Sequence, residues 1–167
     1  MRTDRLQLEH IKPTDFTEVL LMFKENDIFK YIAPLQTFSE VEHIAYLHRK
    51  IDEIKTGKGY LWVARVSDSD EFVGLFNLNP IPDSEEIQIG WILSEKSRGK
   101  GFALEAAKRV FDFGVNEWKI DPIYAVVEDG NIPSEKIALK LGLKYFHDFK
   151  DNQGTALKKF KYSTKSI

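Results

Sequence analysis

Cysteine is absent from the 167 residues of this sequence. Its absence excludes disulfide bonds, thiolate metal sites and cysteine nucleophiles. Long apolar runs are also missing, since none approaches the ~18 residues that a membrane-spanning helix needs. The N-terminus, residues 1–5, is charged and lacks the apolar segment of a secretory signal. We therefore expect a cytoplasmic protein without a membrane partner.

An excess of either charge is missing as well. The chain has 24 Lys and Arg against 26 Asp and Glu, which gives a net charge of −2. Association with nucleic acid or anionic membranes depends on an excess of basic groups, because it releases counterions. No nucleic-acid partner is therefore expected. The four histidines, at positions 10, 43, 48 and 147, show no metal-binding spacing such as His-x-x-x-His, and no metal site is expected.

Apolar residues, in contrast, are abundant enough for a folded core. They make up 43% of the chain and include 12 Phe. This composition excludes intrinsic disorder. Because a domain usually has ~100–200 residues, we expect a single domain over residues 1–167.

The periodicity of the apolar residues predicts a mixed sheet. Strands are predicted at 5–11, 60–66, 72–79, 86–93, 123–127, 143–149 and 156–162. Helices are predicted after Asp15, after Ser39, and at 102–118 and 133–141. Asp15 with Glu18, and Ser39 with Glu42, have the spacing of a capping box, and His43 is expected on a solvated helix face. The fold class is therefore α/β (α+β), a mixed sheet of about seven strands with about four helices.

The strongest motif is a glycine-containing loop, residues 97–101, between the fourth predicted strand and the helix that follows it. Glycine lets backbone N–H groups converge, and the first turn of a helix carries unpaired N–H groups and a positive dipole end. With Arg98 and Lys100 beside them, these groups form an anion site suited to a pyrophosphate. A P-loop motif is absent, and the dinucleotide fingerprint fails because Leu104 stands at its third glycine. The alternative is a glycine-containing connector beside a core helix.

The pattern Arg98-x-x-Gly101-x-Ala103 resembles the acetyl-CoA pyrophosphate loop of the GNAT acetyltransferase superfamily. Further motifs resemble its RimJ/RimL-like branch, in that branch's order and along the whole chain: Thr3-Asp4-Arg5-Leu6, Pro13-Thr14-Asp15, Ile89-Gly90-Trp91-Ile92, Glu105-Ala106, Asn131-x-x-Ser134 and Lys140-Leu141-Gly142-Leu143. The resemblance implies the GNAT fold, in which the fourth and fifth strands splay apart. It also implies an N-acetyltransferase without a metal, in which a primary amine attacks acetyl-CoA directly in a ternary complex. The acceptor would be a protein N-terminus or a small amine. Relatives of this kind are often dimers, so a homodimer is compatible with the resemblance.

The resemblance further implies which residues bind acetyl-CoA. Backbone groups on the fourth strand would pair with the pantetheine arm and polarise the acetyl carbonyl: Trp91, Ile92 and Leu93. The loop and the first helical residues would hold the pyrophosphate: Arg98, Gly99, Lys100, Gly101, Phe102 and Ala103. Asn131 would bind the pantetheine, and Ser134 would also contact the cofactor.

Acetyl transfer needs a base, because the attacking amine must first lose a proton. Many relatives carry a carboxylate where Gln88 stands, and an amide cannot accept the proton. Glu86, two residues earlier on the same strand face, is the predicted base, acting through water. Glu85 is the weaker candidate, and both residues also fit solvated charges at the start of a strand.

Transfer also benefits from a proton donor for the departing thiolate. Ala138 stands where many relatives have a Tyr general acid. The RimJ/RimL-like branch instead has a serine at the position of Ser134, which the resemblance makes the proton donor. The alternative is that Ser134 is only the N-cap of its helix.

Two other functions fit the same features. Gln88 and Ala138 are compatible with a non-catalytic acyl-CoA-binding module, and the anion loop alone is compatible with a nucleotide-binding regulator. A set of aromatic residues is expected either to line the acceptor cleft or to pack in the core: Tyr31, Trp62, Phe76 and Trp91.

Overall fold

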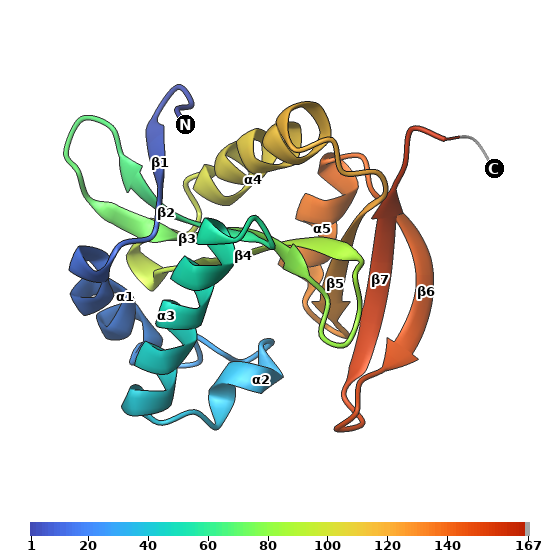
Figure 1. Ribbon diagram of the computed structural model, residues 1–167, viewed down its shortest axis with the longest axis horizontal. Coiled ribbons are helices and arrows are strands. Elements are labelled where there is room, and N and C mark those ends of the chain that lie inside the picture. Colours follow the sequence, from blue (N-terminus) through green and yellow to red (C-terminus); the bar gives the residue numbers. More distant parts are fainter. Residues whose placement is uncertain (166–167) are drawn as a thin grey trace.

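The computed structural model describes residues 1–165, so the last two residues of the predicted domain, 166–167, lie outside the described part. One seven-stranded sheet runs through the molecule in the order β1-β2-β3-β4-β5-β7-β6 (Figure 1). The strands are β1 (Leu6–His10), β2 (Tyr60–Val66), β3 (Phe72–Pro80), β4 (Ile87–Leu93), β5 (Ile123–Glu128), β6 (Lys144–Lys150) and β7 (Ala156–Tyr162). The α-helices are α1 (Phe16–Phe23), α2 (Ala33–Gln36), α3 (Glu40–Lys55), α4 (Phe102–Asp112) and α5 (Ile132–Lys140).

This architecture confirms the predicted fold class and the predicted strands to within a few residues. The short helix α2 was not predicted, because its four residues are too few to show a helical period. The predicted helix at 102–118 is divided, since α4 ends at Asp112 and a π-helical turn, Phe113–Glu117, follows it. None of the helices within residues 1–165 has the length and apolar character to cross a membrane.

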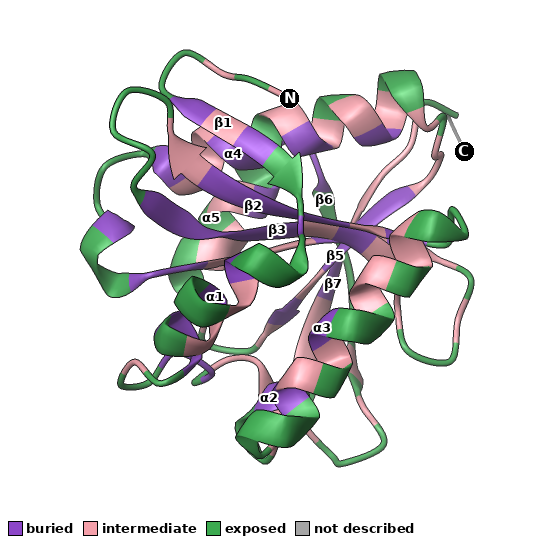
Figure 2. Cartoon of the chain, turned by 60° about the vertical axis from the view of Figure 1, so that its left-hand side comes forward, coloured by how far each residue is buried: buried purple, intermediate pink, exposed green. Residues whose placement is uncertain are grey.

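Alternation along the strands sends apolar side chains to both faces of the sheet. On one face Trp62 and Phe76 pack with α4 and α5, and on the other Leu61 and Leu75 pack with α1 and α3. Figure 2 shows the central strands buried between these two layers of helices. Trp62 and Phe76 are only 1% and 0% exposed, so these two aromatic residues belong to the core and not to an acceptor cleft.

The sheet opens between β4 and β5. The other pairs of neighbouring strands are antiparallel, whereas β4 and β5 are parallel and share a single pair of facing residues, Gln88 and Tyr124. Beyond Gln88 the two strands diverge, which confirms the predicted splay of the fourth and fifth strands. The last residues of β4 therefore keep one backbone edge without a strand partner in the described chain.

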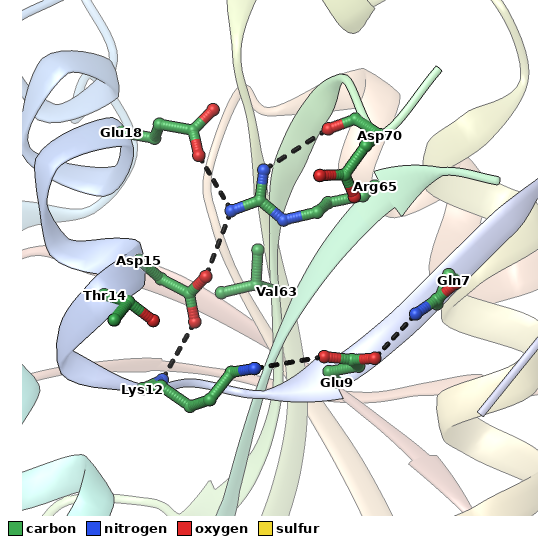
Figure 3. A pocket seen from close by; sticks show the side chains of 9 residues that line it. All are labelled: Gln7, Glu9, Lys12, Thr14, Asp15, Glu18, Val63, Arg65 and Asp70. Atoms are coloured by element: carbon green, nitrogen blue, oxygen red, sulfur yellow. Dashed lines mark hydrogen bonds and ion pairs between the residues drawn. The ribbon is translucent and has the colours of Figure 1, made fainter. Parts of the chain in front are cut away.

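The start of α1 differs from the prediction. Asp15 does not cap α1 together with Glu18; it ends a 3-10 turn, Pro13–Asp15, and its Oδ2 accepts from the backbone N–H of Lys12 at 2.9 Å. Its Oδ1 lies 3.0 Å from Arg65 Nη2, which also lies 2.8 Å from Glu18 Oε1 (Figure 3). Arg65, fifty positions from Asp15, thus forms ion pairs with both carboxylates, Asp15 and Glu18, that the local spacing had predicted as a capping box.

The start of α3 agrees with the prediction. Ser39 Oγ accepts from the N–H of Glu42 at 3.2 Å, and Glu42 Oε2 accepts from the N–H of Ser39 at 3.0 Å. His43, however, is only 8% exposed, and the expectation of a solvated ring is wrong. The segment around α2 folds over it, so that His43 Nε2 lies 3.0 Å from the carbonyl oxygen of Leu35 and the ring packs among aromatic neighbours.

Candidate active site

The loop that enters α4 presents a row of free backbone donors. Gly99 and Gly101 adopt φ values of +75° and +80°, which favour glycine, and Gly101 is the N-cap of α4. The N–H of Arg98 donates to Glu95 and that of Glu105 donates to Gly101. Between them, over residues 1–165, none of the N–H groups of residues 99–104 has a hydrogen-bond acceptor. We call residues 98–104 the α4 loop; its free donors and the positive end of α4 can surround an anion.

The two cations of the α4 loop are placed differently. Both are exposed, but Arg98 folds back toward β4, where its Nη2 lies 3.2 Å from the carbonyl oxygen of Leu93. Below the loop, Ser94 Oγ and Ser97 Oγ lie 3.0 Å apart and are buried. This pair fixes the turn between β4 and the α4 loop. Sequence reasoning missed it, because serine in a loop usually indicates only solvation.

The register of β4 decides which of its backbone groups face the opening. The N–H of Ser94 donates to Val73 at 2.9 Å, and the carbonyl oxygen of Ile92 points toward Gly74, so these groups face β3. Because backbone groups of successive residues alternate in direction, those of Trp91 and Leu93 face the β5 side. Of the three predicted contacts, Trp91 and Leu93 therefore lie on the open edge, and the backbone of Ile92 belongs to the β3–β4 ladder.

The start of α5 faces this edge. Asn131, not Ser134, is the N-cap of α5, and Asn131 Oδ1 accepts from the N–H of Ser134 at 3.4 Å. The helix-cap alternative for Ser134 is therefore wrong. Trp91 Nε1 donates to Ser134 Oγ at 3.2 Å, which ties β4 to α5 across the opening. Because the serine oxygen accepts this bond, its own proton stays available for another partner.

The predicted base lies at the other end of β4. Glu86 Oε2 forms an ion pair with Lys159 Nζ, which also lies 4.3 Å from the centroid of the Tyr124 ring. The hydrogen bond from Lys159 holds the pKa of Glu86 below its usual value, although partial burial acts in the other direction. Trp91 is five residues further along the strand, which corresponds to ~17 Å. A proton path from the neighbourhood of Trp91 to Glu86 therefore requires water.

A row of amides lies on the sheet face that α3 covers, and sequence reasoning did not single it out. Asn77 faces Gly90 and Asn79 faces Gln88 across β3 and β4, and Asn77 Nδ2 donates to Asn79 Oδ1. A side chain at position 90 would collide with Asn77, since a Cβ there would lie 2.7 Å from Asn77 Oδ1. The signal was present in the sequence, because Asn77 and Asn79 interrupt an apolar strand at period 2. We call Asn77, Asn79 and Gln88 the amide row.

Tyr31, expected to line an acceptor cleft or the core, lies in the segment between α1 and α2. Its hydroxyl is 3.4 Å from the carbonyl oxygen of Gly130, directly before α5. The N-terminal and C-terminal halves of the chain thus meet beside the opening. Within residues 1–165, no group of three His, Cys, Asp or Glu side chains is arranged to hold a metal ion.

Comparison with known proteins agrees with this geometry. The family model described as acetyltransferase (GNAT) domain matches residues 5–144. The chain is 28% identical over 149 residues to the uncharacterized protein YkkB of Bacillus subtilis (strain 168), which covers 86% of this chain and 84% of YkkB.

Solved structures that share the fold include the following two. The first is RimL, a ribosomal L7/L12 alpha-N-protein acetyltransferase in complex with coenzyme A, with a TM-score of 0.83, 14% identity and coverage of 96% of this chain and 95% of that one. The second is spermidine N-acetyltransferase from Vibrio cholerae in complex with CoA and spermine, with a TM-score of 0.78, 16% identity and coverage of 95% of each chain. A family match over most of the chain, on a sheet that opens between β4 and β5, identifies this protein as a member of the GNAT family of N-acetyltransferases.

Proposed function

We propose that the protein transfers the acetyl group of acetyl-CoA directly to a primary amine within a ternary complex. The observation that carries the proposal is that two sets of free backbone N–H groups lie on one stretch of chain: those of Trp91 and Leu93 on the open edge of β4, and those of residues 99–104 in the α4 loop. The chain has no cysteine to carry the acetyl group on a thiol, which favours direct attack over a covalent intermediate.

In the proposed complex, the pyrophosphate of acetyl-CoA lies against the N–H groups of the α4 loop, from Gly99 through Phe102 and Ala103, beside Arg98 and Lys100. The pantetheine arm follows the open edge of β4. Asn131 and Ser134 face the arm from the start of α5. This path leads from the free N–H groups of the α4 loop to the point where Trp91 Nε1 donates to Ser134 Oγ.

The chemistry follows from these groups. The neutral amine attacks the thioester carbonyl, and the C–S bond breaks as the new C–N bond forms. Negative charge on the carbonyl oxygen is stabilised by N–H groups on the edge of β4. Ser134 donates a hydrogen bond to the departing thiolate, and the proton from the amine passes through water to Glu86. The amine must be neutral before it attacks, and a protein α-ammonium group, with a reference pKa of about 7.7–8.0, reaches that state more readily than a lysine ammonium group at about 10.4.

The amide row favours an acceptor that carries hydrogen-bonding groups next to its amine. A peptide N-terminus has such groups in its first peptide bonds. A polyamine would instead need several free carboxylates, whereas Glu86 is already paired with Lys159. We therefore propose a protein N-terminus as the acceptor, with small primary amines as the second candidate class.

Two measurements test the proposal. Acetyl-CoA at ~100 times its dissociation constant should stabilise the folded protein by about 2.7 kcal/mol, and NAD and ATP should do so much less. Release of free thiol is then followed with peptide N-termini, polyamines and amino acids as acceptors. Stabilisation without thiol release in any mixture would indicate an acyl-CoA-binding module, and a stronger effect of ATP or NAD would indicate a nucleotide-binding regulator.

A further inference from the structure

The segment before β1 is attached to the α4 loop, about a hundred residues away along the chain. Arg5 Nη1 donates to the carbonyl oxygen of Lys100 at 2.9 Å, and the Arg5 guanidinium lies 4.6 Å from the centroid of the Phe102 ring. Arg5 Nη2 is also the heavy atom that a Cβ at Gly101 would approach, at 3.3 Å. One side chain therefore touches three consecutive residues of the α4 loop.

Glu105, in the first turn of α4, holds this arginine. Its Oε2 lies 2.7 Å from both Arg5 Nε and Arg5 Nη2, and its Oε1 accepts from the N–H of Arg5 at 2.9 Å and from Thr3 Oγ1 at 2.6 Å. Burial raises the pKa of Glu105, but the hydrogen bonds from Thr3 and Arg5 outweigh this effect and bring the pKa below its usual value. The Arg5 side chain is 48% exposed and that of Glu105 19%, so the carboxylate is the more enclosed partner of the pair.

The bond from Arg5 to Lys100 fixes the direction of the peptide group between Lys100 and Gly101. In a trans peptide the C=O and N–H point in opposite directions. Since Arg5 holds the carbonyl oxygen, the N–H of Gly101 points away from Arg5. This N–H lies in the middle of the free donors of residues 99–104.

We propose that Arg5, held by Glu105, is a positioning residue that orients the α4 loop for the pyrophosphate of acetyl-CoA. The proposal rests on the proposed function, because it assumes that acetyl-CoA binds at this loop. Arg5 acts in it through the Lys100–Gly101 peptide and not by contact with the phosphates.

The first test compares two acetyl donors, acetyl-CoA and acetyl-pantetheine, which lacks the pyrophosphate. Arg5→Ala should raise KM for acetyl-CoA by about tenfold or more, because a charge-assisted hydrogen bond to the loop is lost. It should leave kcat within about twofold and leave kcat/KM for acetyl-pantetheine unchanged. Arg5→Lys should resemble Arg5→Ala, because an ammonium cannot make the forked contacts of a guanidinium. Arg109→Ala is the matched control, since Arg109 lies on α4 and pairs only with Asp112 and Glu117 in the described chain.

Equal losses with both donors would show that Arg5 supports the fold as a whole, and an unchanged KM in both Arg5 variants would also overturn the proposal. If acetyl-CoA does not bind the wild-type protein, the proposed function itself fails. If the wild type binds and the Arg5 variants bind equally well, only the positioning role fails.

The second test asks whether replacing Glu105 raises or lowers KM for acetyl-CoA. Glu105→Met keeps the length of the side chain but removes its charge and its acceptors. If Arg5 merely attracts the phosphates, removal of this negative charge should lower KM for acetyl-CoA. The positioning role predicts the reverse, a rise of KM toward that of Arg5→Ala, with little further change in the double variant. A lower KM in Glu105→Met would overturn the proposal.

Discussion

The two sides of the opening between β4 and β5 are built in different ways. The proposed donor side consists mainly of backbone groups from one continuous stretch, the end of β4 and the α4 loop. The proposed acceptor side depends on side chains that reach distant parts of the chain, such as Tyr31, whose hydroxyl lies near the carbonyl oxygen of Gly130, and Glu86, which pairs with Lys159. The donor can therefore be recognised through main-chain geometry that many sequences can form, whereas recognition of the acceptor depends on the particular side chains of this sequence.

The largest effect should come from breaking the donor side at its backbone. Gly101→Val places a branched side chain at φ +80° and should weaken acetyl-CoA binding by about 100-fold, measured by calorimetry. Gly154→Val is the matched control, because Gly154 has φ +82° in the β6–β7 hairpin. Both variants should lose roughly 1–2 kcal/mol of folding stability. Equal binding by the two variants would show that the α4 loop is only a connector.

The next effect concerns the proton from the acceptor. Glu86→Gln should lower kcat by roughly 100-fold if Glu86 is the terminal base, with KM for acetyl-CoA unchanged. Because Lys159 lowers the pKa of Glu86, the carboxylate is ionised at every pH above its usual pKa of 4.5. The rise of kcat/KM between about pH 6 and 9 should therefore follow the deprotonation of the acceptor amine. Wild-type turnover in Glu86→Gln would remove this residue from the reaction.

A smaller effect on kcat is expected for Ser134, and it should distinguish this residue from the helix cap Asn131. Ser134→Ala should lower kcat about tenfold at saturating acetyl-CoA, because the thiolate loses a hydrogen bond but is already a fair leaving group. Its melting temperature should stay close to that of the wild type, since Ser134 is not the cap. Asn131→Ala should instead lose roughly 0.5–2 kcal/mol of stability. The reverse assignment, with stability lost in Ser134→Ala and not in Asn131→Ala, would contradict the structure.

The amide row should respond more weakly and only toward the acceptor. Asn79→Leu removes hydrogen-bonding groups beside Gln88 while keeping the number and branching of the side-chain heavy atoms, and it should raise KM for a peptide acceptor by about three- to tenfold. KM for acetyl-CoA should not change. Asn116→Leu is the control, because Asn116 lies outside the sheet and donates only to Asp112 in the described chain. A change in KM for acetyl-CoA alone would place the amide row on the donor side.

The smallest expected effect is a change in how folding stability falls at acidic pH. Glu86 and Glu105 have folded-state pKa values below the usual 4.5, so their ion pairs stabilise the folded protein fully above about that pH. This contribution is lost as the pH falls through the lowered folded pKa values. Thermal unfolding between pH 6 and 3 should show a smaller acid loss in Glu105→Met than in the wild type. An identical pH dependence would contradict the depressed pKa of Glu105.

Much of the fold and of the donor side could be predicted because the determinants are local. The strands follow from period-2 alternation, the Ser39 cap from a three-residue spacing, and the α4 loop from a contiguous motif. The failures involve distant partners. Arg65 takes Asp15 from across fifty positions, and the segment around α2 buries His43. No spacing rule within a helix contains that information.

The same limit applies to the acceptor side. Lys159 lies 73 positions from Glu86, and nothing near Glu86 in the sequence indicates that its charge is paired. Gly90 was predicted as part of a strand, but the reason for a glycine there is the Asn77 side chain across the ladder. Residues of this kind become interpretable only when the register of the strands is known.

The single facing pair between β4 and β5 also has a consequence for motion. Strands β1 to β4 and strands β5 to β7 are each held by antiparallel ladders, but within residues 1–165 only Gln88 and Tyr124 pair across the sheet between the two groups. Amide protons at Trp91 and Leu93 should therefore exchange with solvent faster than those deep in β3, on the time scale of local opening. A substrate that bonds along the edge of β4 would occupy the place of a missing strand. Binding would then slow exchange at these amides and make the two groups of strands move as one.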